Sequence, residues 1–293
     1  MRKMVLFCLC FLSASYVFAA SQPQAPVAKP EFQDLQPDLA KVTVERLNDR
    51  YPLSDQNNAG DWLAYEPMND EFEDQTLDEA KWWDHNPGWL GRQPGFFYPQ
   101  NVTVSDGKLH LTMKKEEVPE MPKDKGYQTY TCAAVKSKDR VLYGYFEVKA
   151  RPMDSAGSSS FWFYHSTDDW WTEIDVFELG AGVPKFEKTM HINVHVFRTP
   201  GEGKNHWSVG GQFIAPERLA NDYHVYGLEW DSKEVKFYFD GVLVRKGENT
   251  HWHQPLHLNF DSETMPEWFG LPNDEDLPST YSIEYVRAWK KRN

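Results

Sequence analysis

The sequence predicts an all-β fold, an antiparallel β-sandwich. Apolar and polar residues alternate through many short runs, as they do in strands with one buried face. Tight-turn sequences separate such runs, among them Ser105-Asp106-Gly107 and Phe239-Asp240-Gly241. Long helical periodicity is absent, and only residues 215–221 could form a short helix. Many evenly spaced strands with turns between them are typical of sandwiches.

The first element is a predicted secretory signal peptide over residues 1–20. Two basic residues are followed by an apolar run over residues 5–12 and by Ala19 and Ala20, a small-residue cleavage region. A lipoprotein anchor on Cys8 or Cys10 is the weaker alternative, because no small-residue lipobox precedes either cysteine. No later apolar stretch approaches the ~20 residues of a membrane helix. We therefore expect a secreted protein, extracellular or periplasmic, with no membrane anchor.

A flexible linker is predicted over residues 21–58, which are rich in Gln, Pro, Asp and Asn, with one short helix near residues 38–48. Aromatic density rises at Asp61-Trp62, so the folded domain is expected over residues 59–293. Cys132 is the one cysteine after the signal peptide and is expected to be a small buried hydrophobe. The clearest strand patterns in this domain lie at residues 101–115, 141–152, 189–197, 224–232, 234–246 and 281–289.

Charge and aromatic content indicate the kind of ligand. Forty-four acidic against 31 basic residues give a net charge of −13, which argues against a nucleic-acid partner because such proteins neutralise phosphates with Lys and Arg. The chain has 12 Trp, 14 Tyr and 18 Phe. So many aromatic side chains on an acidic protein favour stacking against sugar rings.

Three acids lie close together in WWTEIDVFELGAG, residues 170–182. Glu173 and Asp175 share one face of a regular strand, whereas Glu178 would fall on the other face. One extra residue, a β-bulge near Val176 or Phe177, would return Glu178 to their face. Three like charges on one face repel one another, so the arrangement needs a reason.

Glycoside hydrolysis supplies that reason. A retaining mechanism uses two carboxyl groups roughly 5–5.5 Å apart, one as the nucleophile and one as the proton donor. A neighbouring negative charge favours protonation of the donor by raising its pKa. The alternatives are a solvated acidic strand face and a calcium site. The flanking tryptophans and the FWFY run at residues 161–164 favour a groove.

The segment resembles the signature of glycoside hydrolase family 16, E-I-D-x-x-E, complete here at residues 173–178. The resemblance extends from about Asp61 to the end and includes residues 66–83, 143–152, 224–241 and 281–291. It implies a jelly roll with a concave substrate cleft, Glu173 as the nucleophile, Glu178 as the acid/base and Asp175 as the assisting acid. The flanking sequences look closest to the algal-galactan branch of β-agarases, β-porphyranases and carrageenases.

Further residues are predicted to bind substrate. Aromatic stacking is expected from Trp89, Trp162, Trp171 and Trp268, with Trp83, Trp207 and Trp252 as further candidates and core packing as the alternative for several of them. Asn193 and His195, with His191, share one face of a strand. Arg92 and Arg198 are candidate sulfate ligands, with surface ion pairing as the alternative. Glu263, Glu267 and Trp268 are assigned to a loop at the cleft edge.

No cofactor is required by this chemistry, and no catalytic metal is expected. The resemblance allows a structural calcium ion, with which the acids Asp70, Glu71 and Glu73 are compatible, although no regular calcium loop is visible. The sequence thus predicts a secreted, monomeric endo-hydrolase that retains configuration and cleaves internal β-1,4 linkages of a red-algal galactan. Agarose or porphyran comes first and carrageenan or furcellaran next. The alternatives are a β-1,3-glucanase, a transglycosylase and a non-catalytic carbohydrate-binding jelly roll.

Overall fold

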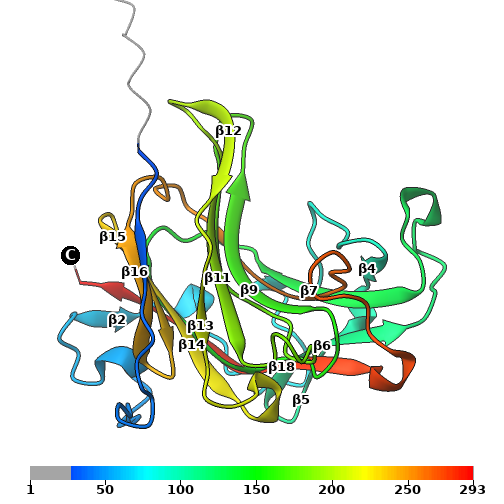
Figure 1. Cartoon of the computed structure of the whole chain (residues 1–293), viewed down its shortest axis with the longest axis horizontal. Helices are drawn as coiled ribbons and strands as arrows, with labels where there is room; N and C mark the ends of the chain where they lie inside the picture. Colours follow the sequence, from blue (N-terminus) through cyan, green and yellow to red (C-terminus); the bar gives the residue numbers. More distant parts are fainter. Residues whose placement is uncertain (1–27, 293) are drawn as a thin grey trace, which may run out of the picture.

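The computed structural model describes residues 28–292, so the predicted signal peptide lies outside the described residues. Two antiparallel sheets stack face to face, as the sequence predicts (Figure 1). The back sheet has the order β1–β16–β15–β14–β8–β18–β6–β5, with β2 on the last residues of β18. The front sheet has the order β11–β10–β9–β17–β7–β3, with β12 and β13 both on the free edge of β11.

The back-sheet strands are β1 (Phe32–Asp34), β2 (Trp62–Ala64), β5 (Val102–Ser105), β6 (Lys108–Lys115), β8 (Gly144–Arg151), β14 (His224–Trp230), β15 (Glu234–Phe239), β16 (Val242–Glu248) and β18 (Ser279–Lys291). The front-sheet strands are β3 (Trp82–Trp83), β7 (Tyr130–Ser137), β9 (Ser158–Ser166), β10 (Trp171–Leu179), β11 (Thr189–Thr199), β12 (Gly203–Ser208), β13 (Gly211–Ile214) and β17 (His257–Glu263). The short strand β4 (Gly95–Phe97) pairs in parallel with β7, which also joins the two sheets through β6.

Helix is restricted to six short 3₁₀ turns among the described residues, at Leu53–Asp55, Glu66–Met68, Pro99–Asn101, Lys123–Lys125, Leu219–Asn221 and Asp274–Asp276. The Leu219–Asn221 turn lies within the short helix predicted for residues 215–221. Both predicted tight turns form hairpins, β5–β6 and β15–β16. In the first, Asp106 and Gly107 have φ of 52° and 68°, the left-handed conformation that a two-residue type I′ turn requires.

Large apolar side chains fill the space between the sheets. Phe163 of the front sheet packs on Phe146 of the back sheet with ring centroids 5.0 Å apart, and Phe177 packs on Tyr226 at 4.4 Å. Cys132 is buried in the same core, as predicted, and burial raises the pKa of its thiol. The front sheet uses its inner face for this core, so its outer, concave face is free to form a site (Figure 1).

The predicted linker is wrong for residues 28–58, which pack on the sandwich instead of forming a flexible segment. Strand β1 pairs with β16, and Asp34 forms an ion pair with buried Arg245. Leu53 is buried, and its backbone N–H donates to the Glu147 carboxylate at 2.8 Å. The helix predicted near residues 38–48 is replaced by a single turn at residues 39–41. The residues that anchor this segment are few and irregularly spaced, so its sequence shows no periodic pattern from which its packing could be predicted.

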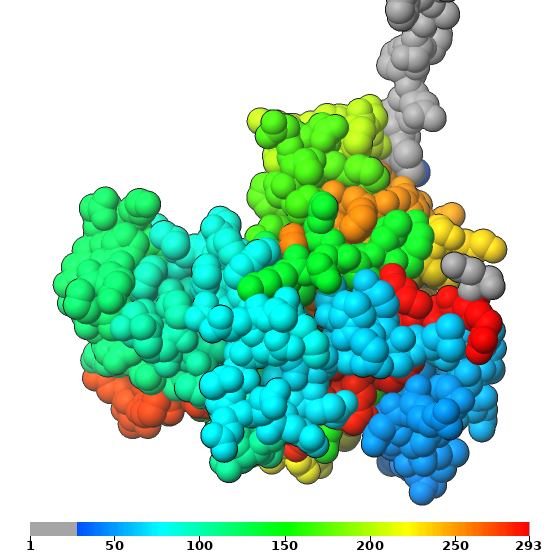
Figure 2. Space-filling model, turned by 180° about the vertical axis from the view of Figure 1, so that it is seen from behind, coloured from blue at the N-terminus to red at the C-terminus, as the bar shows by residue number. Residues whose placement is uncertain are grey.

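The N-terminal segment adjoins the C-terminal strand, as the neighbouring blue and red surfaces in Figure 2 show. Arg46 forms an ion pair with fully buried Glu147 and donates to the Tyr285 hydroxyl at 2.9 Å. The Trp289 indole N–H donates to the Arg50 carbonyl at 2.8 Å. The folded unit therefore starts well before the predicted boundary at residue 59. None of the helices within residues 28–292 has the length and apolar character needed to cross a membrane.

Candidate active site

A β-bulge in β10 places the three signature acids. Asp175 lies opposite Trp162 of β9, whereas Phe177 lies opposite Phe161, the next residue back along β9. Val176 is therefore the extra residue, at one of the two predicted positions. Val176 and Phe177 are both fully buried, so two consecutive side chains enter the core. Because two consecutive residues point inward, the alternation of inward and outward side chains shifts by one residue, and Glu178 points to the outer face.

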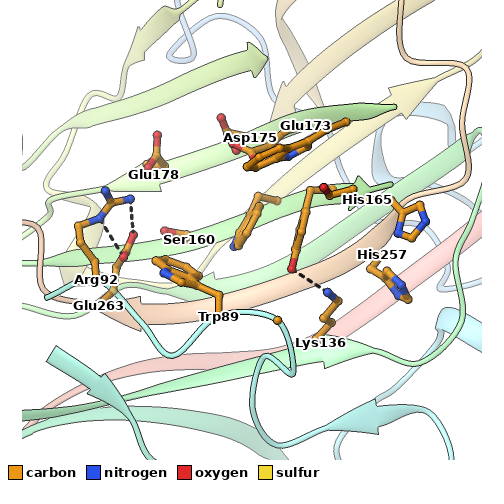
Figure 3. Close-up of a pocket in the computed structure, with 15 residues that line it drawn as sticks. Trp89, Arg92, Lys136, Ser160, His165, Glu173, Asp175, Glu178, His257 and Glu263 are labelled. Atoms are coloured by element: carbon orange, nitrogen blue, oxygen red, sulfur yellow. Dashed lines mark hydrogen bonds and ion pairs between the residues drawn. The ribbon is translucent and has the colours of Figure 1, made fainter. Parts of the chain in front are cut away.

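Glu173, Asp175 and Glu178 consequently line one groove on the concave front sheet (Figure 3). The groove comprises a pocket of about 580 Å³ and a second of about 780 Å³, and both are lined by all three acids and by Trp89 and Arg92. A third hollow of about 450 Å³ continues past Glu178. These connected hollows offer room for an extended chain rather than for a single small molecule.

Burial and neighbouring charges raise the pKa of both glutamates. Burial, followed by the charges of Asp175 and Glu178, raises the pKa of Glu173 well above its usual range. Burial, followed by Asp175 and Glu263, raises the pKa of Glu178 well above its usual range. The Arg92 charge opposes both shifts. Two such interacting carboxyl groups lose their protons in separate steps, so one can be ionised while the other holds a proton.

Asp175, the middle acid, has a histidine partner. Nε2 of His195 on β11 lies 3.2 Å from Oδ2 of Asp175, whose side chain is buried. Nδ1 of His195 lies 3.3 Å from Nε2 of His206 on β12. His195 and Asn193 both line the groove, as the sequence predicts for this face of the strand.

Arg92 lies at the groove wall, but its guanidinium is already engaged. It donates to Glu263 through Nε at 3.0 Å and through Nη2 at 3.4 Å (Figure 3). Glu263 is the last residue of β17 and is buried, so its predicted position on a loop is wrong. Burial raises the pKa of Glu263 to about 7, although Arg92 lowers it. Arg92 therefore pairs with a buried acid in the groove wall.

Aromatic rings form the floor beside the acids. Trp162 and Tyr164, two residues apart on β9, stack with centroids 4.7 Å apart and 15° between their planes. Trp89 packs edge-on against Trp162 at 6.1 Å from the loop before β4. The Trp162 indole N–H donates to buried Asp261 at 2.6 Å, which fixes the ring in the groove. Apolar sugar faces pack well on such rings.

The remaining predicted residues divide between the groove and its surroundings. Trp171 lines the groove and stacks on Phe197 at 4.0 Å. Arg198 lies over Trp171 at 5.2 Å and donates to the Thr167 carbonyl and the Ser166 hydroxyl, and it lines none of the three hollows. Trp268 is 41% exposed on the loop after β17 and lines two hollows. Trp207 and Trp252 are core residues, and Trp83 packs on His257.

The acids considered for calcium have protein partners. Asp70 accepts hydrogen bonds from the Trp82 indole and the Phe72 backbone, and Glu71 forms an ion pair with Arg287. Within residues 28–292, the one set of three metal-ligand side chains with donor atoms within 4.8 Å of one another is Glu173, Asp175 and His195. Asp70, Glu71 and Glu73 do not form such a set among the described residues.

The sequence analysis did not single out several groove residues, among them Lys136 on β7, Tyr164 and His165 on β9, and His257 on β17. It also missed Asp261 on β17, which accepts the hydrogen bond of the Trp162 indole. Tyr164 shares the parity of Trp162, and His257 and Asp261 share the parity of Glu263, so strand alternation could have identified them. Lys136 lies in a run that is buried throughout and gave no signal. Burial raises the pKa of Asp261 well above its usual range, so it adds a further titratable carboxyl to the site.

Comparison with known proteins agrees with this geometry. Residues 62–291 match the family model described as beta-porphyranase A-D, GH16 domain. Beta-porphyranase B of Zobellia galactanivorans is 30% identical over 259 residues, which cover 78% of this chain and 85% of the relative. The crystal structure of porphyranase B from the same organism has a TM-score of 0.69 at 28% identity, covering 78% of this chain and 92% of that one. Glucan endo-1,3-beta-glucosidase A1 of Niallia circulans is 28% identical over 262 residues, 76% of this chain and 37% of that protein.

The matching family model and the relatives, together with the acids grouped among aromatic rings in a concave β-jelly roll, identify a glycoside hydrolase. The chain belongs to glycoside hydrolase family 16, within the group described by the beta-porphyranase A-D domain. The predicted fold, family and enzyme class are thereby confirmed. A non-catalytic carbohydrate-binding jelly roll is no longer the competing interpretation.

Proposed function

We propose that this protein is a secreted, retaining endo-hydrolase that cleaves internal β-1,4 linkages of a red-algal galactan. Agarose or porphyran is the first candidate substrate, and carrageenan or furcellaran the next. The observation that supports this proposal is the Val176 bulge, because it brings Glu173 and Glu178 to one groove face. A double-displacement mechanism needs both carboxyl groups beside the same glycosidic bond.

In the proposed mechanism, Glu178 is the acid and Glu173 the nucleophile. Glu178 donates its proton to the leaving glycosidic oxygen while the Glu173 carboxylate attacks the anomeric carbon. The carbon–oxygen bond breaks, and a covalent glycosyl-enzyme forms. Glu178, now ionised, takes a proton from water, and the water oxygen displaces Glu173. Two inversions at the same carbon retain the configuration.

The raised pKa values of both glutamates suit this division of work. Once Glu173 is ionised, its charge and that of Asp175 favour a proton on Glu178. Asp175 is held by His195 at 3.2 Å and lies between them along the strand. As the assisting acid, Asp175 helps to keep a proton on Glu178 while Glu173 is ionised.

Groove shape and the relatives support the substrate class. Three connected hollows lined by Trp89, Trp162, Trp171 and Trp268 suit a polysaccharide bound along its length. The beta-porphyranase match favours a galactan. The similarity to a glucan endo-1,3-beta-glucosidase supports a β-1,3-glucanase as the second candidate.

Reducing-sugar release from a substrate panel tests the proposal. The panel comprises agarose, porphyran, κ- and β-carrageenan, laminarin and mixed-linkage glucan, with Glu173→Gln as the control. We expect hydrolysis of one algal galactan, lost in the variant, with shorter oligosaccharides as products. Activity on laminarin alone would replace the substrate class, and longer rearranged chains would indicate a transglycosylase. Proton NMR of the first product reports retention or inversion at the anomeric carbon.

Secretion is tested separately from activity. Expression of residues 1–293 in a host with a Sec pathway should give a processed protein whose N-terminus lies near residue 21. Mass spectrometry of the exported protein measures that terminus. An unprocessed protein retained in the cytoplasm would contradict the proposed signal peptide.

A further inference from the structure

The N-terminal segment contributes a side chain to the end of the groove. The third hollow, of about 450 Å³, is lined by Glu178, by Trp268, by residues of β11 and β13, and by Asp34 of β1. The family model matches residues 62–291, so Asp34 lies outside the domain that the family model describes. It reaches the hollow because residues 28–58 pack on the sandwich.

Strand β1 and the residue Gln36 after it connect the two sheets beside this hollow. β1 pairs with β16 of the back sheet, and Figure 1 shows the blue segment running alongside that strand. The Gln36 side chain bonds to β13 of the front sheet. Its Nε2 donates to the Gln212 carbonyl at 3.1 Å, and its Oε1 accepts from the Ile214 N–H at 3.3 Å. The N-terminal segment therefore holds β13 on the side away from β11.

A buried arginine fixes the Asp34 carboxylate. Arg245 on β16 donates through Nη1 to Oδ1 of Asp34 and through Nη2 to the Val209 carbonyl at 3.0 Å. Its guanidinium also lies over the Phe32 ring, 4.8 Å from the centroid. Burial lowers the pKa of Arg245, and the Asp34 charge opposes that shift. Asp34 is therefore the counter-ion of a buried guanidinium, and its carboxylate has a fixed direction.

The acid, and not the arginine, faces the hollow. The Asp34 side chain is 40% exposed, whereas that of Arg245 is 2% exposed. Gly211 of β13 leaves the space that the pair occupies, because a Cβ there would overlap Arg245 Nη1 and Asp34 Oδ1. Gly210 and Gly211 also line the hollow, so no side chain of theirs covers the carboxylate.

This hollow lies on the side of the leaving group. It is lined by Glu178 but by neither Glu173 nor Asp175, which line both other hollows. In the proposed mechanism Glu178 protonates the leaving oxygen, so sugars beyond Glu178 belong to the leaving group. Glu178 lies opposite His191, and His191 opposite Gln212. Two strand spacings of ~4.8 Å place β13 about 10 Å from the Glu178 backbone, beyond the first leaving-group sugar.

The side chains of the hollow suit an uncharged sugar. Asp34, Asn193 and Gln212 offer oxygens that accept hydrogen bonds, and Trp268 offers a ring for an apolar sugar face. Burial lowers the pKa of His191, so its ring is neutral at pH 7. Among the described residues, no Lys or Arg lines this hollow. An acid without a facing cation accepts hydroxyl groups and repels sulfate or carboxylate groups.

We propose that Asp34 binds a hydroxyl group of an uncharged sugar on the leaving-group side, and that Arg245 positions it. This inference rests on the proposed function, because it requires a polysaccharide in the groove. Oδ1 is held by Arg245, and Oδ2 accepts no hydrogen bond from the described residues, so it is available to a sugar O–H. The N-terminal segment is then part of the substrate site.

Cleavage of oligosaccharides of graded length tests this contact. They come from the polysaccharide of the panel that the protein hydrolyses best, and a heavy-oxygen label at the reducing end lets mass spectrometry identify each cleaved bond. Asp34→Ala should lower kcat/KM about tenfold where the leaving group is long enough to reach β13, the effect of one hydrogen bond to a charged group. Cleavage that releases a single sugar should change less than about twofold.

Gln36→Ala is the matched control. It removes two hydrogen bonds between the same segment and β13, but no group that lines the hollow. It should change every cleavage by the same factor. Asp34→Ala combined with Arg245→Met leaves no buried guanidinium unpaired, so this double variant replaces the single one if Asp34→Ala does not fold. It should show the same dependence on the length of the leaving group.

Equal losses for short and long leaving groups would overturn the Asp34 contact, as would the same length dependence in Gln36→Ala. A charged sugar mapped to this position would contradict the uncharged ligand. Failure of the proposed function looks different, because the protein would then hydrolyse laminarin and no galactan. Laminarin oligosaccharides would replace the others, and a length-dependent loss in Asp34→Ala would leave the contact standing. No hydrolysis of any substrate would overturn both, since no leaving group would form.

Discussion

His195 lies directly opposite Glu173 on the neighbouring strand, yet its Nε2 reaches diagonally to Asp175, 3.2 Å from Oδ2. The histidine therefore bridges the positions of the proposed nucleophile and the assisting acid. Its other ring nitrogen contacts His206, so β11 and β12 together orient the ring. A side chain in this place fixes where the Asp175 carboxylate points.

His195→Ala should lower kcat about tenfold or more, because Asp175 loses the partner that orients it. KM should change much less, since the floor rings remain. His206→Ala is the matched control, one contact further from the acid, and should cost less than His195→Ala. Steady-state kinetics on the galactan hydrolysed best would measure both. A larger loss for His206→Ala would contradict the proposed role of His195.

Asp175→Asn should move the pH optimum to lower pH. The Asp175 charge raises the pKa of both Glu173 and Glu178, so its removal lowers both. The acidic limb of the kcat/KM profile reports ionisation of Glu173, and the alkaline limb reports deprotonation of Glu178. Both limbs should therefore shift in the acidic direction. A shift to higher pH, or no shift, would rule out this coupling.

The roles of the two glutamates can be separated with azide. Glu173→Ala and Glu178→Ala should each lower kcat by about 10³-fold or more. Azide should restore Glu178→Ala by attacking the glycosyl-enzyme, giving a product with the configuration of the substrate. With Glu173→Ala, azide attacks directly and gives the inverted product. NMR distinguishes the retained from the inverted glycosyl azide. An inverted product from Glu178→Ala and a retained product from Glu173→Ala would mean that Glu178 is the nucleophile and Glu173 the acid/base.

Glu263→Gln should flatten the pH dependence of stability between pH 4.5 and 7. The pKa of Glu263 is about 7 in the folded protein against an ordinary 4.5, so the folded state binds the proton more tightly. Its contribution to stability is complete below pH 4.5 and is lost as the pH rises through 7. Urea unfolding at pH 4.5 and 7.5 measures the difference. Exposed Glu267→Gln is the control and should keep the slope of the unsubstituted protein.

Arg46→Met should destabilise the fold by about 3 kcal/mol, because it leaves the Glu147 carboxylate buried without its nearest cation. Arg46→Met with Glu147→Gln should recover part of that loss, since no buried charge then remains. Urea unfolding of the two single variants and the double variant gives the coupling energy. If Arg46→Met left stability unchanged, residues 28–58 would not be part of the cooperative unit.

The chain pattern predicted the sandwich because a strand repeats every two residues, and that repeat can be read without knowing its partners. Both tight turns followed from the same local reasoning, since Asp-Gly adopts the left-handed turn geometry. The N-terminal segment was mispredicted because Phe32, Arg46 and Leu53 are isolated anchors. Their partners lie far along the chain: Phe32 packs on Gly247, and Arg46 and Leu53 both contact Glu147. These contacts can be recognised only when the back sheet is known. A Cβ on Gly247 would lie 2.5 Å from the Phe32 ring.

The sequence by itself determined the all-β fold, the family and the three acids at residues 173–178, together with the need for one extra residue near Val176. These features depend on order along one strand, which the chain specifies directly. Tertiary structure decided which residues meet across strands: Arg92 with Glu263, Asp175 with His195, and Lys136 at the far end of the groove. Such contacts depend on the register between strands and loops that are distant in the sequence. The alternation of apolar and polar residues within a single strand does not reveal which strands pair or in which register.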